Sequence, residues 1–263
     1  MGGAILSGLL KSGFNPDNVS VSTKSTESAE RLTDELGVLS FAMENGDDAN
    51  QMAVAGANVI LIAVKPAYVT EVLADIADSL DDNALIISVA AGITTAAMEK
   101  VLPEDVGVIR AMPNTPAIVS RAITGIAAGE RATDWAIETA VQLFDTVGKS
   151  IVLAESKIDE LGTISGSGPA YVFFLIEALT AAAKQKGFAD DEAALLVNET
   201  FLGAAELLIA SGKDPADLRK QVTSPNGTTE RAIARMTQAD LAQMFIEATD
   251  AALARSKELA AGK

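Results

Sequence analysis

Residues Val59–Val89, VILIAVKPAYVTEVLADIADSLDDNALIISV, contain the pattern that decides the fold. Two continuous apolar runs, Val59–Val64 and Leu85–Val89, are typical of strands buried on both faces of a parallel sheet. The segment between them, Ala67–Leu80, has the amphipathic spacing of a helix. A strand, a helix and a second strand of these lengths predict a βαβ unit.

The same alternation extends over the first ~150 residues. Val19–Ser22 is a further predicted strand, and Gly107–Arg110 and Gly125–Ala128 are weaker ones. Thr26–Leu36 and Thr94–Leu102 are amphipathic and predict helices. The fold class of this half is therefore α/β with a doubly wound sheet.

The second half of the chain lacks this alternation and is predicted to be all-helical. One of its helices is nearly all apolar over Ala170–Ala183, which indicates both the centre of a bundle and a subunit interface. We predict an α/β domain at 1–150 and a helical domain at 151–263. The predicted helices of the second domain are Pro169–Lys186, Asp190–Ser211, Pro215–Val222, Thr228–Met236 and Thr237–Leu259.

The composition limits the chemistry that the chain can perform. Cysteine and histidine are both absent, which excludes thiolate nucleophiles, a Ser-His-Asp triad and metal sites built on either residue. We predict no metal and favour cofactor chemistry, in which the protein mainly binds and orients. The formal net charge of −16 makes nucleic acid and anionic membranes unfavourable partners.

Targeting segments are not evident in the sequence. No run of consecutive apolar residues approaches the ~20 that span a membrane. The short apolar run Ala4–Leu10 has no basic segment before it that would indicate a signal peptide. The absence of cysteine is compatible with a reducing cytosol, and we expect a cytoplasmic protein that binds a small molecule.

A dinucleotide site is indicated near the start of the chain. Such a site begins with a strand and G-x-G-x-x-G, whereas this chain opens MGG and goes directly into a helical pattern. Gly2 is either the last glycine of that fingerprint or a flexible terminal residue. The segment Ser22–Lys24 has hydroxyls and a cation where an NAD site has a carboxylate. It favours the 2′-phosphate of NADPH, and an exposed polar turn is the alternative.

Small residues and prolines follow the next predicted strands. Ala63–Pro66 and Ala90–Gly92 would leave room for a flat ligand at the carboxyl edge of the sheet, although each alone also fits an ordinary turn. Arg110–Pro116, RAMPNTP, is either a rigid functional loop or an interdomain linker.

Two helix starts in the second half are rich in serine, threonine and glycine. Ser165–Pro169, SGSGP, suits helix capping and resembles the G-x-G-x-x-x-K motif of β-hydroxyacid dehydrogenases. Val172 stands where that motif has the lysine that acts on a hydroxyl proton, so the alcohol-oxidising base is missing. Ser224–Thr229, SPNGTT, offers hydroxyls and amides at the positive end of a helix, which suits a carboxylate. An ordinary capped helix is the alternative.

In order along the chain, the motifs AVKP, SVAAGI, RAMPNTP, SGSGPAY and VTSPNGTT resemble the pyrroline-5-carboxylate reductase family over essentially the whole sequence. The resemblance implies a Rossmann domain, a helical dimerisation domain, and homodimers that can assemble into decamers. It implies hydride transfer from NADPH, with NADH as the alternative, to the imine carbon of 1-pyrroline-5-carboxylate to give L-proline. An imine needs no base to remove a hydroxyl proton, which agrees with Val172 and with the missing histidines.

The resemblance also implies the residues of the site. Thr229 matches the residue proposed to hydrogen-bond the ring nitrogen and is the predicted catalytic residue. The predicted substrate-binding residues are Val222, Ser224, Asn226, Gly227, Thr228 and Thr229. The predicted cofactor-binding residues are Gly2, Ser22, Thr23, Lys24, Asn45, Ala63, Val64, Lys65, Pro66, Ala90, Ala91, Gly92 and Asn114.

The sequence departs from the family pattern at two places. Asn226 replaces a glycine, and we expect little effect because asparagine tolerates left-handed backbone conformations. The family's first strand and two glycines have no counterpart ahead of Met1, so we expect a sheet without a central strand. One alternative is a reductase of another cyclic imine or of a hydroxy acid on the same architecture. The other, because of the short N-terminus, is a dimer deficient in cofactor binding.

Overall fold

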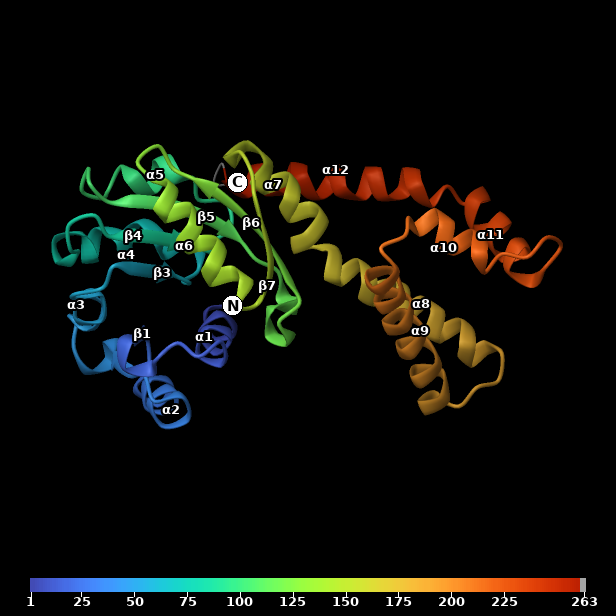
Figure 1. Cartoon of the computed structure of the whole chain (residues 1–263), viewed down its shortest axis with the longest axis horizontal. Coiled ribbons are helices and arrows are strands. Elements are labelled where there is room, and N and C mark those ends of the chain that lie inside the picture. The colour runs from blue at the N-terminus through green and yellow to red at the C-terminus, as the bar shows by residue number, and fades with distance from the viewer. Residues whose placement is uncertain (261–263) are drawn as a thin grey trace. The chain divides into compact units, whose positions relative to one another are not determined.

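A computed structural model describes residues 1–260, with the side chains of residues 1–258 (Figure 1). The chain forms two compact units: a sheet unit of Met1–Ser167 with the chain from Ala252 onward, and a helical unit of Gly168–Ala251. The last strand ends at Val152 and helical structure begins at Glu155, close to the change of pattern predicted near residue 150. The compact units divide later because the first helical turns after Glu155 contact the sheet.

The sheet unit alternates strands and helices as the α/β prediction requires, and the fold class is confirmed. Five elements were not predicted: β2, α3, α6, β7 and α7. The elements are α1 (Gly2–Lys11), β1 (Ser20–Thr23), α2 (Thr26–Leu36), β2 (Leu39–Ala42), α3 (Ala49–Val54), β3 (Val59–Ile62), α4 (Val69–Ile76), β4 (Leu85–Ser88), α5 (Thr95–Glu99), β5 (Gly107–Met112), β6 (Ala122–Ala128), α6 (Asp134–Asp145), β7 (Gly148–Val152) and α7 (Ile158–Leu161).

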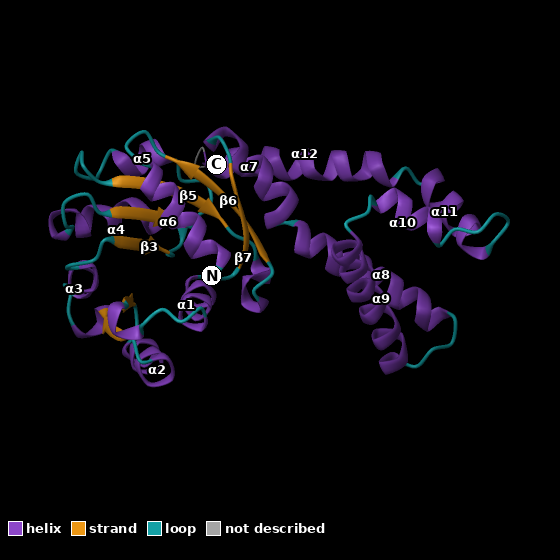
Figure 2. Cartoon of the chain, viewed as in Figure 1, coloured by secondary structure: helices purple, strands orange, loops and turns teal. Residues whose placement is uncertain are grey.

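The strands form two sheets (Figure 2). β1 and β2 pair in parallel, and a five-stranded sheet has the order β3-β4-β5-β6-β7. All neighbours in the larger sheet are parallel except β5 and β6. Another strand lies between the equivalents of β1 and β3 in the usual 3-2-1-4-5-6 order. Among the described residues β1 pairs only with β2 and β3 only with β4, so both keep a free edge.

The larger sheet has a hydrophobic core on each face. All four residues of β4 are buried, as the continuous apolar run predicted. Ile86 packs in a cluster with Leu73 of α4, while Leu85 and Ile87 pack in a second cluster with Phe144 of α6. Alternate residues of one strand therefore serve opposite faces, which fixes the register of the carboxyl edge where the predicted cofactor turns lie.

The helical unit confirms the predicted helices within a few residues. It contains α8 (Gly168–Gln185), α9 (Asp190–Ser211), α10 (Pro215–Gln221) and α11 (Thr228–Gln238), with most of α12 (Leu241–Ala260). α9 ends where Gly212 adopts a left-handed conformation, with φ of 60°. α8 and α9 pack side by side, and Tyr171 contacts Phe245 edge-to-face with ring centroids 6.3 Å apart.

Candidate functional site

The predicted cofactor residues of the sheet unit lie mainly at the carboxyl ends of strands. Gly2 begins α1, and a Cβ added to it would lie 2.9 Å from the Cβ of Ala63, directly after β3. Because Gly2 has no side chain, the start of the helix can approach this strand end. Ala63, Val64, Lys65 and Pro66 are all exposed, so this edge is open to a ligand.

A second group of predicted residues meets where β1 leads into α2. Ser22 and Thr23 are half-buried at the end of β1, and Lys24 is exposed. The Oδ1 of Asn45 accepts a hydrogen bond from the Thr26 hydroxyl at 2.9 Å. The fold therefore brings Asn45 to the start of α2, which directly follows the segment Ser22–Lys24 in the chain.

A carboxylate that the sequence analysis did not single out lies at the same helix start. The Oε2 of Glu44 accepts a hydrogen bond from the backbone N–H of Thr26 at 3.0 Å. A negative charge is favourable beside the first amides of a helix, and a phosphate bound there would compete for the same place. The sequence could have indicated Glu44 because it directly precedes Asn45, a predicted cofactor residue.

The third group follows β4 and β5. Ala90 is buried and Ala91 exposed, and Gly92 has a φ of +76°, a conformation that favours glycine. The buried side chain of Asn114 donates to the carbonyl of Ser165 at 3.0 Å and accepts from the N–H of Ile123 at 3.0 Å. Both ends of the Asn114 amide are engaged with the protein, so it braces its loop.

The SGSGP segment differs from the expected capped helix start. Residues Gly162–Gly166 form a π-helical turn that runs on into α8, and Ser165 donates its hydroxyl to the carbonyl of Leu161 at 3.2 Å. The serine hydroxyl thus bonds a carbonyl in the preceding turn and caps no amide. Single π-helical turns inside helices are frequent at functional sites.

The predicted substrate loop lies in the helical unit, between α10 and α11. Asn226 has a φ of 60°, a left-handed conformation that asparagine tolerates better than most residues. The amide of Gly227 donates to the carbonyl of Ser224 at 3.0 Å and closes the turn, so it is not available to a ligand. Gly227 is the N-cap residue of α11 and has no side chain that could accept a hydrogen bond. It therefore provides no side-chain cap for the amides of Thr228 and Thr229 in the first turn.

A carboxylate also accompanies this loop. The Oε2 of Glu230, in the first turn of α11, accepts from the N–H of Asn226 at 2.8 Å. This hydrogen bond holds the loop to the first turn of α11. Val222, which is 65% exposed, and the exposed Ser224 precede the turn.

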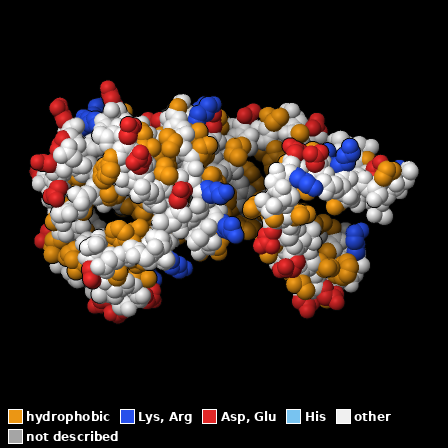
Figure 3. Space-filling model, viewed as in Figure 1, with side chains coloured by type: hydrophobic (Ala, Val, Ile, Leu, Met, Phe, Trp, Pro, Cys, Tyr) orange, Lys and Arg blue, Asp and Glu red, His pale blue; other side chains and the backbone are white. Residues whose placement is uncertain are grey.

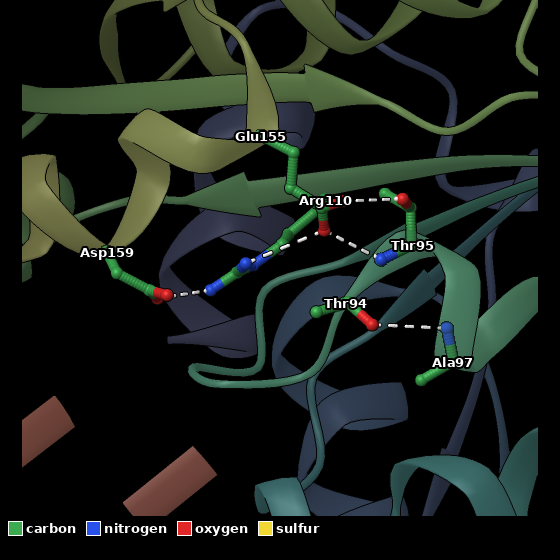
Figure 4. Close-up of polar contacts among 6 residues, drawn as sticks. All are labelled: Thr94, Thr95, Ala97, Arg110, Glu155 and Asp159. Atoms are coloured by element: carbon green, nitrogen blue, oxygen red, sulfur yellow. Dashed lines mark hydrogen bonds and ion pairs between the residues drawn. The ribbon is translucent and has the colours of Figure 1, made fainter. Parts of the chain in front are cut away.

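A buried ion-pair network joins β5 to the segment Glu155–Asp159, and the sequence alone did not predict it. Arg110 of β5, with its side chain 3% exposed, pairs with Glu155 and Asp159 (Figure 4). The signals were a lone cation inside an apolar strand and two carboxylates four residues apart, on one helix face. Among the described residues no group of His, Cys, Asp and Glu side chains is arranged to hold a metal ion.

The helical unit exposes large apolar side chains (Figure 3). Phe173 and Phe174 of α8 are 66% and 67% exposed, and Leu195 and Ile209 of α9 are 64% and 70% exposed. Patches of this kind mark a protein or membrane contact. By length and composition alone, the helical runs Glu155–Gln185 and Asp190–Ser211 could cross a membrane, which the search for continuous apolar runs did not indicate.

Comparison with known proteins identifies the family of the chain. The chain is 36% identical over 262 residues to the pyrroline-5-carboxylate reductase of Corynebacterium melassecola, covering 98% of this chain and 95% of the relative. The chain belongs to the pyrroline-5-carboxylate reductase family. Pyrroline-5-carboxylate reductases of Methanosarcina acetivorans and Pseudomonas aeruginosa are 35% and 36% identical, over 98% and 99% of this chain and 94% and 93% of theirs.

Family models and solved structures agree with this assignment to the pyrroline-5-carboxylate reductases. Residues 155–259 match a model described as pyrroline-5-carboxylate reductase dimerisation, and residues 1–92 match one described as NADP oxidoreductase, coenzyme F420-dependent. The pyrroline-5-carboxylate reductase of Coxiella burnetii is similar with a TM-score of 0.92 at 35% identity, over 98% of this chain and 94% of that one. That of Plasmodium falciparum, solved with NADP bound, has a TM-score of 0.84 at 23% identity over 99% and 94%, and shows the fold.

Proposed function

We propose that the chain transfers a hydride from NADPH to the imine carbon of 1-pyrroline-5-carboxylate and so forms L-proline in the last step of proline biosynthesis. Full-length similarity to pyrroline-5-carboxylate reductases supports this reaction. The structural observation that carries the proposal is the start of α11. There Gly227 offers no side-chain acceptor, and the amides of Thr228 and Thr229 suit the substrate carboxylate.

The residues at the strand ends of the sheet unit fit NADPH, with NADH as the alternative cofactor. Gly2 leaves room against Ala63, Gly92 supplies a left-handed turn, and Lys24 is an exposed cation suited to the 2′-phosphate. When bound, NADPH supplies the hydride. The residues proposed to hold it are Gly2, Ser22, Thr23, Lys24, Asn45, Ala63, Val64, Lys65, Pro66, Ala90, Ala91, Gly92 and Asn114.

The substrate loop is proposed to orient the imine. Amides of Thr228 and Thr229 hold the carboxylate, and the Thr229 hydroxyl hydrogen-bonds the ring nitrogen. During reduction the carbon gains the hydride, the C=N π pair moves to nitrogen, and nitrogen carries a proton. A protonated imine is already electrophilic, so the chain needs to hold and orient it and needs no histidine. Val222, Ser224, Asn226 and Gly227 complete the loop.

The two halves of the chain are proposed to divide the work. Residues 1–150 bind NADPH, and residues 151–263 bind substrate and form a homodimer in the cytoplasm. The exposed apolar residues of α8 and α9 support a dimer because a second copy would remove them from water. Decamers built from such dimers are the proposed higher assembly, and no membrane is a partner.

The test is NADPH oxidation in the presence of 1-pyrroline-5-carboxylate. We expect turnover with this imine and none when hydroxy acids are offered with NADP. If the chain reduced only a different cyclic imine, the proposed substrate would be wrong, but the proposed reaction, reduction of an imine, would stand. Failure to turn over any imine would contradict the proposal.

A second candidate is a dimer of this fold with weak cofactor binding. It is favoured by Glu44, which occupies the Thr26 amide where a phosphate would bind. Titration with NADPH, followed by Trp135 fluorescence and by melting temperature, separates the two. Saturable quenching and a raised melting temperature support the reductase, since a ligand stabilises the state it binds.

A further inference from the structure

A cavity of about 130 Å³ lies in the sheet unit at the carboxyl ends of β4 and β5. Its wall includes Ala91 from the turn after β4 and Met112 at the end of β5. The lining also includes Asp159 of α7 with Gly162 and Thr163 of the π-helical turn. The cavity is therefore framed by a turn proposed to hold the cofactor and by the helical run that leads toward the helical unit.

Arg110 connects two of the segments that line the cavity, β5 and α7. Its Nη1 lies 3.5 Å from Glu155 Oε1, and its Nη2 lies 2.5 Å from Asp159 Oδ1 (Figure 4). Asp159 itself lines the cavity, and Met112 is two residues beyond Arg110 on the same strand. The guanidinium thus ties the helical wall of the cavity to β5.

Glu155 extends this connection to the turn after β4, which carries Ala91. Its Oε1 accepts the backbone N–H of Thr95 at 2.7 Å, and its Oε2 accepts the Thr95 hydroxyl at 2.8 Å. Thr95 is buried and begins α5, three residues after Gly92. One carboxylate therefore binds both Arg110 and the end of the turn that carries Ala91 (Figure 4).

The chemistry of the network favours a positioning role over a purely stabilising one. Burying a guanidinium among half-exposed carboxylates is weak evidence for stability, because the desolvation penalty offsets much of the attraction. The Nε of Arg110 is buried and has no hydrogen-bond partner among the described residues, a further penalty. The network keeps these energetic penalties, and it holds the segments that line the cavity at a fixed spacing.

We propose that Arg110 is a positioning residue that sets the shape of this cavity for the nicotinamide end of NADPH. It acts through Glu155 on the Ala90–Gly92 turn and through Asp159 on the π-helical turn. That the ligand is NADPH rests on the proposed function. Whether Arg110 holds the Ala90–Gly92 turn concerns the sheet unit alone and can be measured without turnover.

The test compares Arg110→Met with Phe144→Leu, a core variant on the α6 side of the sheet. Hydrogen exchange of the fragment covering Ala90–Ala97 is measured at a temperature where both variants are folded by circular dichroism. We expect exchange of the Thr95 amide to rise at least ~10-fold in Arg110→Met relative to Phe144→Leu, because its acceptor loses its anchor. Arg110→Lys, which keeps the charge, should recover part of the protection.

Kinetics give the second readout. We expect KM for NADPH to rise ~10-fold in Arg110→Met and to change little in Phe144→Leu. The double variant Arg110→Met with Glu155→Gln should lose no more than Arg110→Met alone, because residues in one network are not additive. Exchange and KM both within about twofold of Phe144→Leu would overturn the positioning role. A wild-type chain that oxidises no NADPH overturns the proposed function instead, and the exchange result still decides whether Arg110 holds the turn.

Discussion

Replacing Asn114 with alanine should destabilise the sheet unit. The side chain is 7% exposed and makes two hydrogen bonds of 3.0 Å, to the Ser165 carbonyl and from the Ile123 N–H. Alanine leaves both groups without this partner, and a buried group left unsatisfied costs about 1–3 kcal/mol. Allowing for partial recovery of the Ser165 carbonyl, the free energy of unfolding should fall by about 2–4 kcal/mol.

Urea denaturation followed by fluorescence measures this loss. Trp135 is the single tryptophan of the chain and lies on α6 in the sheet unit, so its emission reports that unit. The melting temperature should fall by roughly 5–15 °C for a unit of this size. Asn114→Asp is the matched control, because an ionised carboxylate still accepts from Ile123 but cannot donate to Ser165.

We expect Asn114→Asp to lose about half as much as alanine when the buried charge is tolerated, and more when it is not. A loss below ~0.5 kcal/mol in Asn114→Ala, the range of ordinary surface substitutions, would refute the bracing role. Unchanged stability with a raised KM for NADPH would show instead that the Asn114 amide contacts the cofactor directly.

Three further predictions concern the proposed site and the assembly. Thr229→Ala should lower kcat about 10- to 100-fold through loss of one hydrogen bond to the ring nitrogen, while Thr229→Ser stays near wild type; full activity in the alanine variant would remove that role. Glu44→Gln should lower the Kd for NADPH several-fold and leave that for NADH nearly unchanged, because the carboxylate on the Thr26 N–H repels a 2′-phosphate; equal effects on both cofactors in calorimetry would contradict this. Phe173→Asp should shift the protein toward monomer in sedimentation, since a charge would enter an apolar contact, whereas an unchanged dimer would exclude this face of α8 from the interface.

The regular elements were predictable where local chemistry determines them. Thr26–Leu36 was located to the residue because Ser25 caps its first turn and Gly37 ends it in a left-handed conformation. β4 was predictable because a strand buried on both faces is a continuous run of apolar residues, which does not resemble a polar loop. β2 and β7 were missed because LSFA and GKSIV are short and mix polar and apolar residues without a clear period.

The side-chain networks were not predictable from local sequence. Asp159 lies 49 residues from Arg110 in the chain, and nothing in either segment identifies its partner before the sheet is assembled. The hydrogen bond from Asn114 to the Ser165 carbonyl likewise joins two motifs, RAMPNTP and SGSGP, that are distant in the sequence. For the substrate loop, the left-handed Asn226 was predictable from its side chain, but the use of the Gly227 amide to close the turn depends on the detailed backbone path.

The most direct test of the central claim follows the hydride itself. NADPH deuterated at the transferred position is incubated with the chain and 1-pyrroline-5-carboxylate, and the product is analysed by mass spectrometry and NMR. We predict L-proline with one deuterium on the former imine carbon for each NADPH consumed. Proline without deuterium, or NADPH consumption without proline, would contradict the account.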